Sequence, residues 1–186
     1  MIFNIVNFNN KPELEIRQAG TPARRIRRDI RARYYKPLCL LVTLDVMEDG
    51  ELEWNNIKPK IIINRFKYIL ENFDAGKSID MGWMPFWHLS PLDKIWTCYK
   101  NELIVRRTDF SSEGKPKSKQ QLLKAVNYAS VNEDFKECFT DSLQRAEFRQ
   151  LLIELLSREN DLISRQIAYY YQQHTYSIRP QDATGQ

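Results

Sequence analysis

The stretch Met84-Pro85-Phe86-Trp87-His88-Leu89, followed closely by Asp93-Lys94-Ile95-Trp96, combines a proline and two tryptophans in a short run with few polar residues. Aromatic side chains at this density belong to a protein core more often than to a binding site. Beside a proline they can also form a stiff apolar surface on a basic protein. We therefore expect residues 85–89 to form a strand at the mouth of a small sheet, and both interpretations of its apolar surface stay open.

The residues that follow this stretch have the composition of a β-hairpin. Tryptophan, threonine, tyrosine, isoleucine and valine dominate up to Arg107, and Lys100-Asn101 separates two short runs. Such residues are enriched in strands, and the polar pair is typical of a turn. The sequence predicts strands at 95–99 and 102–106, which complete a three-stranded antiparallel sheet with 85–89.

Helices are expected before and after this sheet in the sequence. Residues 37–48 are apolar nearly all round, with Pro37 suited to a first turn and Gly50 suited to the position after the end. Because the residue before a proline disfavours helix, we place a boundary near Tyr35. Asp141 is a plausible N-cap, with Gln144 three residues on. Further helical segments are expected at 59–72, 122–128, 133–139, 141–156 and 160–174.

Together these elements predict an α+β fold that is mainly helical and winged-helix-like, with a small three-stranded antiparallel sheet. At 186 residues the chain is long enough for one domain with small additions. We expect an N-terminal arm at 1–23, a main domain at 24–157, and a C-terminal helix and tail at 158–186.

Charge is distributed unevenly along the chain. The net charge is only +4, yet residues 17–36 are strongly basic. Between Arg17 and Lys36 lie six further arginines: Arg24, Arg25, Arg27, Arg28, Arg31 and Arg33. Arginine forms bidentate contacts with phosphate and guanine, so the band predicts a surface for a polyanion. A solvated basic segment without a ligand is the alternative.

Several functional classes are disfavoured. No apolar run approaches the roughly 20 residues of a membrane span. The three cysteines are odd in number and far apart, and the chain has no CxxC pair. That pattern is typical of reduced thiols in a cytoplasmic protein and disfavours a zinc site. The first ten residues lack the features of a secretory signal.

Catalytic machinery is also poorly represented. The two histidines are too few for a histidine-metal nuclease, and the phosphate-loop and dinucleotide motifs are absent. Glu113-Gly114-Lys115 has the shape of a carboxylate–lysine nuclease motif, but it falls in a predicted basic loop. We therefore expect no enzyme activity, no catalytic residue, no metal and no cofactor.

Binding chemistry is better represented, in three basic sites. Arg106, Arg107 and Thr108 end the hairpin, and a lysine-rich loop follows at 111–119. The first site gathers basic and aromatic residues at the start of the helix expected at 37–48, where free backbone N–H groups can bind a phosphate. Its members are Arg28, Arg31, Arg33, Tyr34, Tyr35 and Lys36. Double-stranded DNA is the polyanion that these sites fit best.

At these residues the chain resembles a known family. Tyr35-Lys36-Pro37-Leu38-Cys39-Leu40-Leu41 resembles the His-Lys/Arg-Pro-Leu-Leu-Leu-Leu opening of the sulfur-binding domains of phosphorothioate-DNA-dependent restriction endonucleases. The stretch from Met84 to Leu89, with Asp93 and Trp96 after it, resembles their Tyr-Pro-Phe-Trp-Arg-Leu motif. The resemblance covers roughly residues 24–157 and includes no histidine-asparagine-histidine nuclease domain.

The resemblance implies a module that places the sulfur of a phosphorothioate in an apolar pocket formed by Met84 and Pro85. It also implies DNA contacts from Arg28, Arg107 and Thr108, and a base or phosphate contact from Lys36. Tyr35 stands where the family has histidine, and Met84 where it often has tyrosine. The alternatives are a general winged-helix-like DNA-binding regulator and the DNA-recognition subunit of a restriction nuclease. A nuclease partner and a homodimer are both compatible with the sequence.

Overall fold

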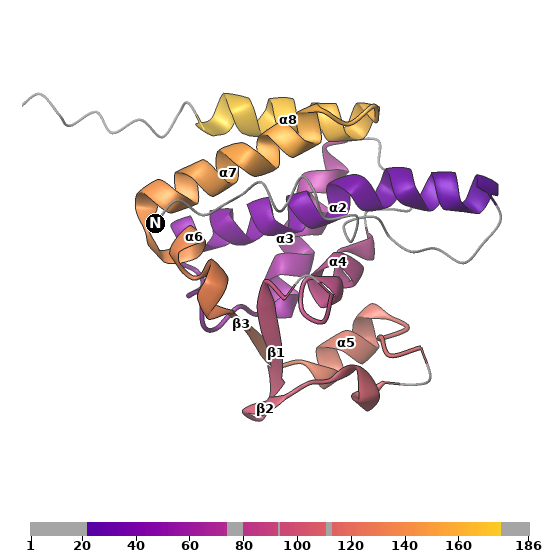
Figure 1. Ribbon diagram of the computed structural model, residues 1–186, viewed down its shortest axis with the longest axis vertical. Helices are drawn as coiled ribbons and strands as arrows, with labels where there is room; N and C mark the ends of the chain where they lie inside the picture. The colour runs from indigo at the N-terminus through magenta and orange to yellow at the C-terminus, as the bar shows by residue number, and fades with distance from the viewer. Residues whose placement is uncertain (1–21, 74–79, 93, 111–112, 176–186) are drawn as a thin grey trace, which may run out of the picture.

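The computed structural model describes residues 22–73, 80–92, 94–110 and 113–175, with side chains from Tyr34 onward and as far as His174 (Figure 1). It shows a mainly helical α+β fold with a small three-stranded antiparallel sheet, as predicted. The longer helices are α2 (Pro22–Glu48), α3 (Pro59–Glu71), α7 (Ser142–Ser157) and α8 (Leu162–Thr175). The shorter elements are α4 (Trp83–His88), β1 (Trp96–Lys100), β2 (Leu103–Ile104), η3 (Arg107–Asp109), α5 (Lys119–Ala125), β3 (Tyr128–Val131), η4 (Glu133–Phe135) and α6 (Glu137–Thr140). None of the helices in the described part of the chain has the length and apolarity required to cross a membrane.

The sheet has the order β2-β1-β3, with both pairs antiparallel. β1 and β2 form the predicted hairpin, in which Tyr99 pairs with Ile104. Its two connecting residues, Asn101 and Glu102, both have positive φ, at 48° and 66°. Two left-handed residues in a two-residue connection match the twist of paired strands, which explains the tight turn.

The third strand differs from the prediction. Residues 85–89 were expected to form it, but the segment Trp83–His88 is the helix α4, and the third strand is β3. Pro85 lies in the first turn of α4, where a backbone N–H has no partner within the helix and its loss costs little. β3 includes Tyr128, the last residue of a predicted helix. Alternating burial, with Ala129 and Val131 inward, is the strand period that the prediction missed.

The start of the central helix also differs. A boundary was expected near Tyr35, but α2 is continuous and contains Pro37. A proline inside a helix removes one backbone hydrogen bond, which normally breaks the helix. Here the residues around it are fully enclosed, since Leu38 and Leu41 are both 0% exposed. Tertiary packing therefore overrides the local preference. The predicted end is confirmed, because α2 stops at Glu48 and Gly50 follows with φ +74°.

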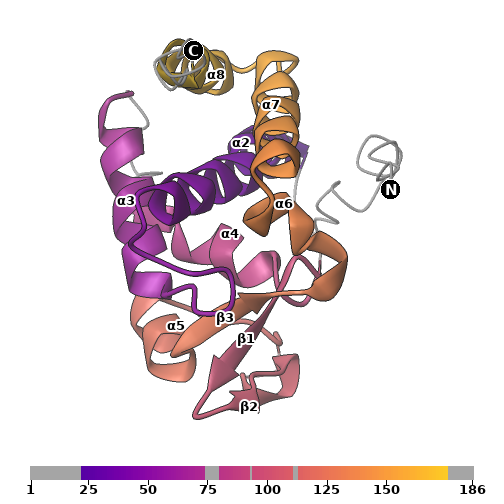
Figure 2. The ribbon, with the colours of Figure 1, turned by 90° about the vertical axis from the view of Figure 1, so that its left-hand side faces the viewer.

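α2 is the central element of the fold. It packs against α7 and α8 on one side and against α3 and α4 on the other, and the sheet lies beyond α4 (Figures 1 and 2). The predicted helices at 59–72, 141–156 and 160–174 are confirmed as α3, α7 and α8. The Asp141 carboxylate accepts a hydrogen bond from the Gln144 N–H at 2.9 Å, as expected of an N-cap. Because α8 packs on α7 and α2, the segment after 157 shares the core of the preceding domain.

A network of charged side chains links α2, α7 and α8. Arg149 is only 7% exposed, and its guanidinium contacts Asp45 at 2.6 Å and Glu48 at 2.8 Å. The Tyr171 hydroxyl donates to the other oxygen of Asp45 at 2.8 Å. Burial raises the pKa of the Asp45 carboxyl, and the Arg149 guanidinium opposes this shift. Each buried charge in this network therefore has a partner of opposite sign or a hydrogen bond.

Candidate nucleic-acid interface

The helix α4 carries the two residues predicted to contact sulfur. Pro85 is buried, whereas Met84 is partly exposed. His88 is also partly exposed and ends the helix, four residues after Met84. Residues at this spacing lie on one face of a helix, so Met84 and His88 are neighbours one turn apart.

The opposite side of α4 is fixed in the core. Phe86 and Trp87 are 0% and 1% exposed, and the Trp87 ring meets Phe110 at 4.7 Å between centroids. The Trp96 indole N–H donates to the Phe86 carbonyl at 3.1 Å, which ties α4 to β1. Rigid anchoring of this kind holds the Met84–His88 face in one orientation.

Three cations from three different elements act electrostatically on His88, at the end of α4. Lys36 comes from α2, Arg107 from η3, and Lys115 from the segment that leads to α5. Burial and the positive charges of these three side chains lower the pKa of His88 to about 4. The imidazole is therefore neutral at pH 7, and the positive charge of the cluster comes from the lysines and the arginine. We call Lys36, His88, Arg107 and Lys115 the cation cluster.

The position of Arg107 depends on the turn and loop around it. The Arg106 N–H donates to the Asp109 carboxylate at 2.7 Å, which closes the η3 turn. Gly114 has φ +61°, and a methyl group added there would lie 3.0 Å from Arg107 Nε. The absence of a side chain at Gly114 thus lets the loop pass directly over Arg107. Lys115 pairs with Glu113 at 3.3 Å on the exposed side of this loop.

The first predicted basic site is built differently from the expectation. The backbones of Arg28, Arg31 and Arg33 belong to α2, but their side chains lie outside the described part of the structure. Tyr35 is 8% exposed, and its ring packs edge-on against Phe66 at 5.8 Å, so the ring belongs to the core. The expected helix N-terminus at Pro37 is wrong, because α2 runs through it. Its free N–H groups are therefore not available for a phosphate there.

The structure does bring other predicted residues together. The charges of Lys36 and Arg107 act on His88 at the end of α4, the helix that carries Met84 and Pro85, and Thr108 is exposed beside Arg107 in η3. Lys36 itself is only 6% exposed, so it contributes chiefly through its charge. The inclusion of His88 in this cluster was not predicted. The sequence signal for it is the spacing of four residues between Met84 and His88. This spacing indicates one shared helical face only if the segment is a helix, and the segment was predicted to be a strand.

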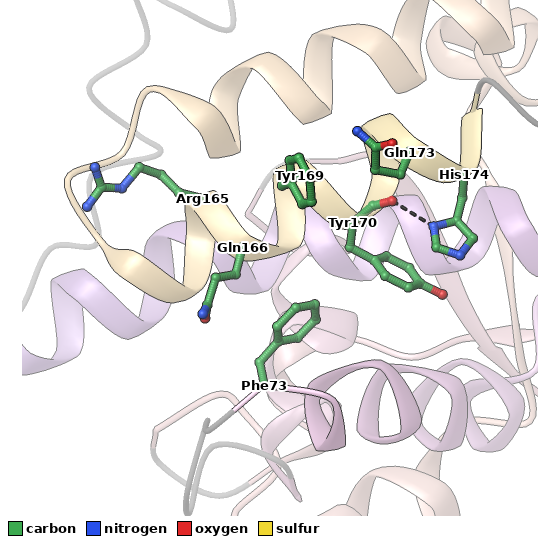
Figure 3. A pocket seen from close by; sticks show the side chains of 7 residues that line it. All are labelled: Phe73, Arg165, Gln166, Tyr169, Tyr170, Gln173 and His174. Carbon is green, nitrogen blue, oxygen red and sulfur yellow. Dashed lines mark hydrogen bonds between the residues drawn. The ribbon is translucent and has the colours of Figure 1, made fainter.

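A separate hollow of about 540 Å³ lies between α8 and the end of α3 (Figure 3). It is lined by Phe73, Arg165, Gln166, Tyr169, Tyr170, Gln173 and His174. The Tyr170 ring packs edge-on against Phe73 at 6.1 Å and lies 4.1 Å from the His174 ring. None of the predicted DNA contacts is among the lining residues, so this hollow is distinct from the cation cluster.

The cysteines and carboxylates offer little reactive chemistry. Cys39, Cys98 and Cys138 are free and buried, as expected. Burial raises the pKa of the Cys98 thiol to about 12, so the thiol stays protonated. Within the described ranges, His, Cys, Asp and Glu side chains form no group of three or more that could hold a metal ion.

Comparisons with known proteins add no assignment. No protein-family model matches the chain, and searches of curated proteins and of solved structures find no significant match. The resemblance to sulfur-binding domains therefore stays a prediction based on the motifs, and the cation cluster beside Met84 is the structural feature on which a functional proposal can be built.

Proposed function

We propose that this chain is a DNA-binding module that recognises phosphorothioate-modified double-stranded DNA through the exposed end of α4 and η3. The observation that carries the proposal is that the positive charges of Lys36, Arg107 and Lys115 act on His88, which lies one turn from Met84 in α4. A cytoplasmic location belongs to the same proposal.

The cation cluster favours an anionic ligand. Positive charges from three elements near one helix end attract an anion such as a phosphate. Arg107 and Thr108 are exposed in η3, where a guanidinium and a hydroxyl can both donate to phosphate oxygens. DNA presents phosphates at regular spacing, and the basic first half of α2 adds charge for a longer contact.

Met84 supports a preference for sulfur. Sulfur is larger than oxygen and a poorer hydrogen-bond acceptor, so an apolar contact penalises the well-hydrated oxygen more. A thioether is apolar and polarisable, which suits this contact. Because Pro85 is buried, Met84 is the accessible half of the predicted pocket, and Pro85 supports it from the core side.

The test compares matched modified and unmodified duplexes in gel-shift titrations at several salt concentrations. We expect both duplexes to bind in a salt-dependent way, with the modified duplex bound more tightly. Arg107→Ala should weaken both by about 10- to 100-fold, equivalent to roughly 1–3 kcal/mol. Met84→Ala should instead reduce the ratio of the affinity for the modified duplex to the affinity for the unmodified duplex.

Arg158→Ala is the matched control for loss of an arginine. Arg158 is exposed at the end of α7 and pairs with Glu154, away from α4. Its loss should leave the affinities for both duplexes within about twofold of those of the native chain. Equal affinity for the two duplexes at every salt concentration would remove sulfur specificity from the proposal.

The burial of Pro85 favours one alternative, a general DNA-binding regulator that uses the same surface. In that case unmodified operator DNA binds tightly, and Pro85→Ala changes only stability. The other alternative, a DNA-recognition subunit, requires a nuclease partner. Cleavage of bound DNA by the purified chain with magnesium or manganese would instead establish a nuclease and contradict the proposal.

A further inference from the structure

The hollow between α8 and the end of α3 takes no part in the proposed DNA contacts, yet it has the composition of a ligand site (Figure 3). Its volume of about 540 Å³ lies within the range of about 300–1,000 Å³ that is typical of small-molecule pockets. The rings of Phe73, Tyr169 and Tyr170 line it. Among the described residues of this lining Arg165 is positively charged and none is acidic. A planar ligand that carries negative charge therefore fits it best.

The Tyr170 ring is fixed in the hollow by contacts on three sides. It meets Phe73 edge-on, with 6.1 Å between centroids, and the buried Tyr171 ring packs edge-on against it at 5.3 Å. The His174 ring lies 4.1 Å from it, with 32° between the two planes. Tyr169, in contrast, is 64% exposed. An exposed ring next to a fixed one leaves an aromatic face on which a planar ligand can stack.

A cation stands at one end of these aromatic residues. Arg165 and Tyr169 are four residues apart in α8, so they lie one turn apart on the same face of the helix. Arg165 is exposed and forms no ion pair with another described residue. Its guanidinium is therefore available for a phosphate, which it can bind through two parallel N–H donors. The exposed amide of Gln166 is adjacent and adds further donors.

A hydrogen-bond acceptor stands at the other end of the hollow (Figure 3). His174 Nδ1 lies 2.8 Å from the Tyr170 carbonyl oxygen. A carbonyl oxygen only accepts, so Nδ1 carries the hydrogen, and Nε2 of the neutral ring is an acceptor. The exocyclic amino group of a nucleobase is a donor that matches this nitrogen.

We propose that this hollow binds a nucleotide, with the base stacked on Tyr169 and the phosphate on Arg165. The amino group of the base then points towards His174, so adenine fits better than a base without an exocyclic amino group. A free nucleotide and an unpaired nucleotide within a strand share this chemistry. The site is separate from the cation cluster, and this inference does not depend on the recognition of duplex DNA.

The test titrates the full chain with adenosine 5′-monophosphate and follows the backbone amide signals by NMR. We expect saturable shifts in α8 and at Phe73, with a dissociation constant below about 1 mM. Inorganic phosphate at the same concentrations should not shift the α8 signals, because it lacks the base. Single-stranded pentadeoxyadenylate identifies the source of the ligand. Binding at least about tenfold tighter than the mononucleotide indicates a strand, and similar or weaker binding indicates a free nucleotide.

Variants at the two exposed residues separate stacking from charge. Tyr169→Ala should weaken adenosine monophosphate by about 5- to 100-fold, whereas Tyr169→Phe keeps the ring and should stay within about twofold of the native chain. Arg165→Ala should weaken adenosine monophosphate at least about fivefold but leave the weaker binding of adenosine unchanged. Arg158→Ala, at the exposed end of α7, is the matched arginine control. Circular dichroism checks that each variant is folded.

Three results would overturn the inference. The first is the absence of α8 shifts up to about 5 mM adenosine monophosphate. The second is a set of shifts confined to α4 and η3, which would place the nucleotide at the cation cluster. The third is an unchanged affinity in Tyr169→Ala. Failure of duplex DNA to bind would leave this inference intact, and failure of the nucleotide to bind would leave the DNA-binding proposal intact.

Discussion

Two regions of this molecule gather charged side chains, and they do so in opposite ways. In the network of α2, α7 and α8, Arg149 meets Asp45 and Glu48, and Tyr171 donates to Asp45. In the cation cluster, the charges that act on His88 are all positive. In the first region opposite charges pair within the chain, whereas the second is the region that we propose binds an anion.

Under the proposed function, this difference separates charge that serves the fold from charge that serves binding. A charge that already has an opposite partner gains little from a ligand, and its loss leaves the partner buried alone. Cations that share one site gain from a ligand of opposite charge. The following predictions test this division, in order of decreasing effect on stability.

Removal of the central cation of the paired network should have the largest effect. Arg149→Met leaves Asp45 and Glu48 without their partner, and should lower the free energy of unfolding by about 3–5 kcal/mol. Urea denaturation at pH 7.5 measures this change. The control Arg158→Met, at an exposed pair, should stay within about 0.5 kcal/mol of the native chain. A loss below about 1 kcal/mol for Arg149→Met would show that this network contributes little to the stability of the fold.

His88 should make the protein less stable in acid. Its pKa is lowered to about 4 in the folded chain, whereas the unfolded chain keeps the ordinary value near 6.5. Above pH 6.5 the His88 ring is neutral in both the folded and the unfolded chain, so it does not lower the free energy of unfolding. As pH falls from 6.5 towards 4, only the unfolded chain takes up the proton, so up to about 3 kcal/mol is lost. Urea titrations from pH 7.5 to 4 give the free energy of unfolding at each pH. The loss appears as a steeper decrease with falling pH in the native chain than in His88→Gln. Parallel profiles would contradict the prediction.

Tyr171→Phe should have a smaller effect on the paired network. The change removes one hydrogen bond to the Asp45 carboxylate but leaves Arg149 in place. We expect a loss of about 1–2 kcal/mol in the free energy of unfolding. Thermal or urea unfolding tests this value. Because α8, which carries the phenol, packs on the side of α2 opposite to α4, DNA affinity should stay unchanged. A change in DNA affinity as large as that of Arg107→Ala would show that the two regions are coupled.

Gly114→Ala should have the smallest effect on stability but also act on binding. The alanine would adopt φ +61°, at a cost of about 1 kcal/mol, and its methyl group would press on Arg107. Gly50→Ala is the matched control, since φ is +74° there and no atom lies within 4 Å of the added methyl group. Both variants should lose similar stability in urea titrations. Only Gly114→Ala should weaken DNA binding in gel shifts. Equal DNA affinities for the two variants would show that the loop does not position Arg107.

Local chemistry was enough to predict several elements. The hairpin followed from β-formers around Lys100-Asn101, and the N-cap of α7 followed from Asp141 with Gln144 three residues on. The amphipathic helix α3 and the end of α2 before Gly50 were also predicted correctly. In each case the signal lies within a few residues, so no knowledge of distant neighbours is needed.

Prolines produced the two main errors. Pro37 predicted a helix boundary, and Pro85 was assigned to a strand, yet both residues lie within helices. The outcome in α2 depends on burial of residues such as Leu38 and Leu41, which pack against other helices. α4 depends on Trp96, ten residues away, whose indole binds the Phe86 carbonyl. A short apolar run does not reveal such contacts.

The sequence by itself determined the mainly helical α+β class, the hairpin and the concentration of arginine before residue 36, because composition and short-range periodicity decide these features. Only the tertiary structure decided that α4 presents Met84 and His88 on one face, and that the charges of Lys36, Arg107 and Lys115 act on His88. These residues come from separate elements, and their approach depends on how α2, η3 and the loop at Gly114 pack around α4. The physical reason is that electrostatic interactions act across space, whereas sequence patterns record only neighbours along the chain.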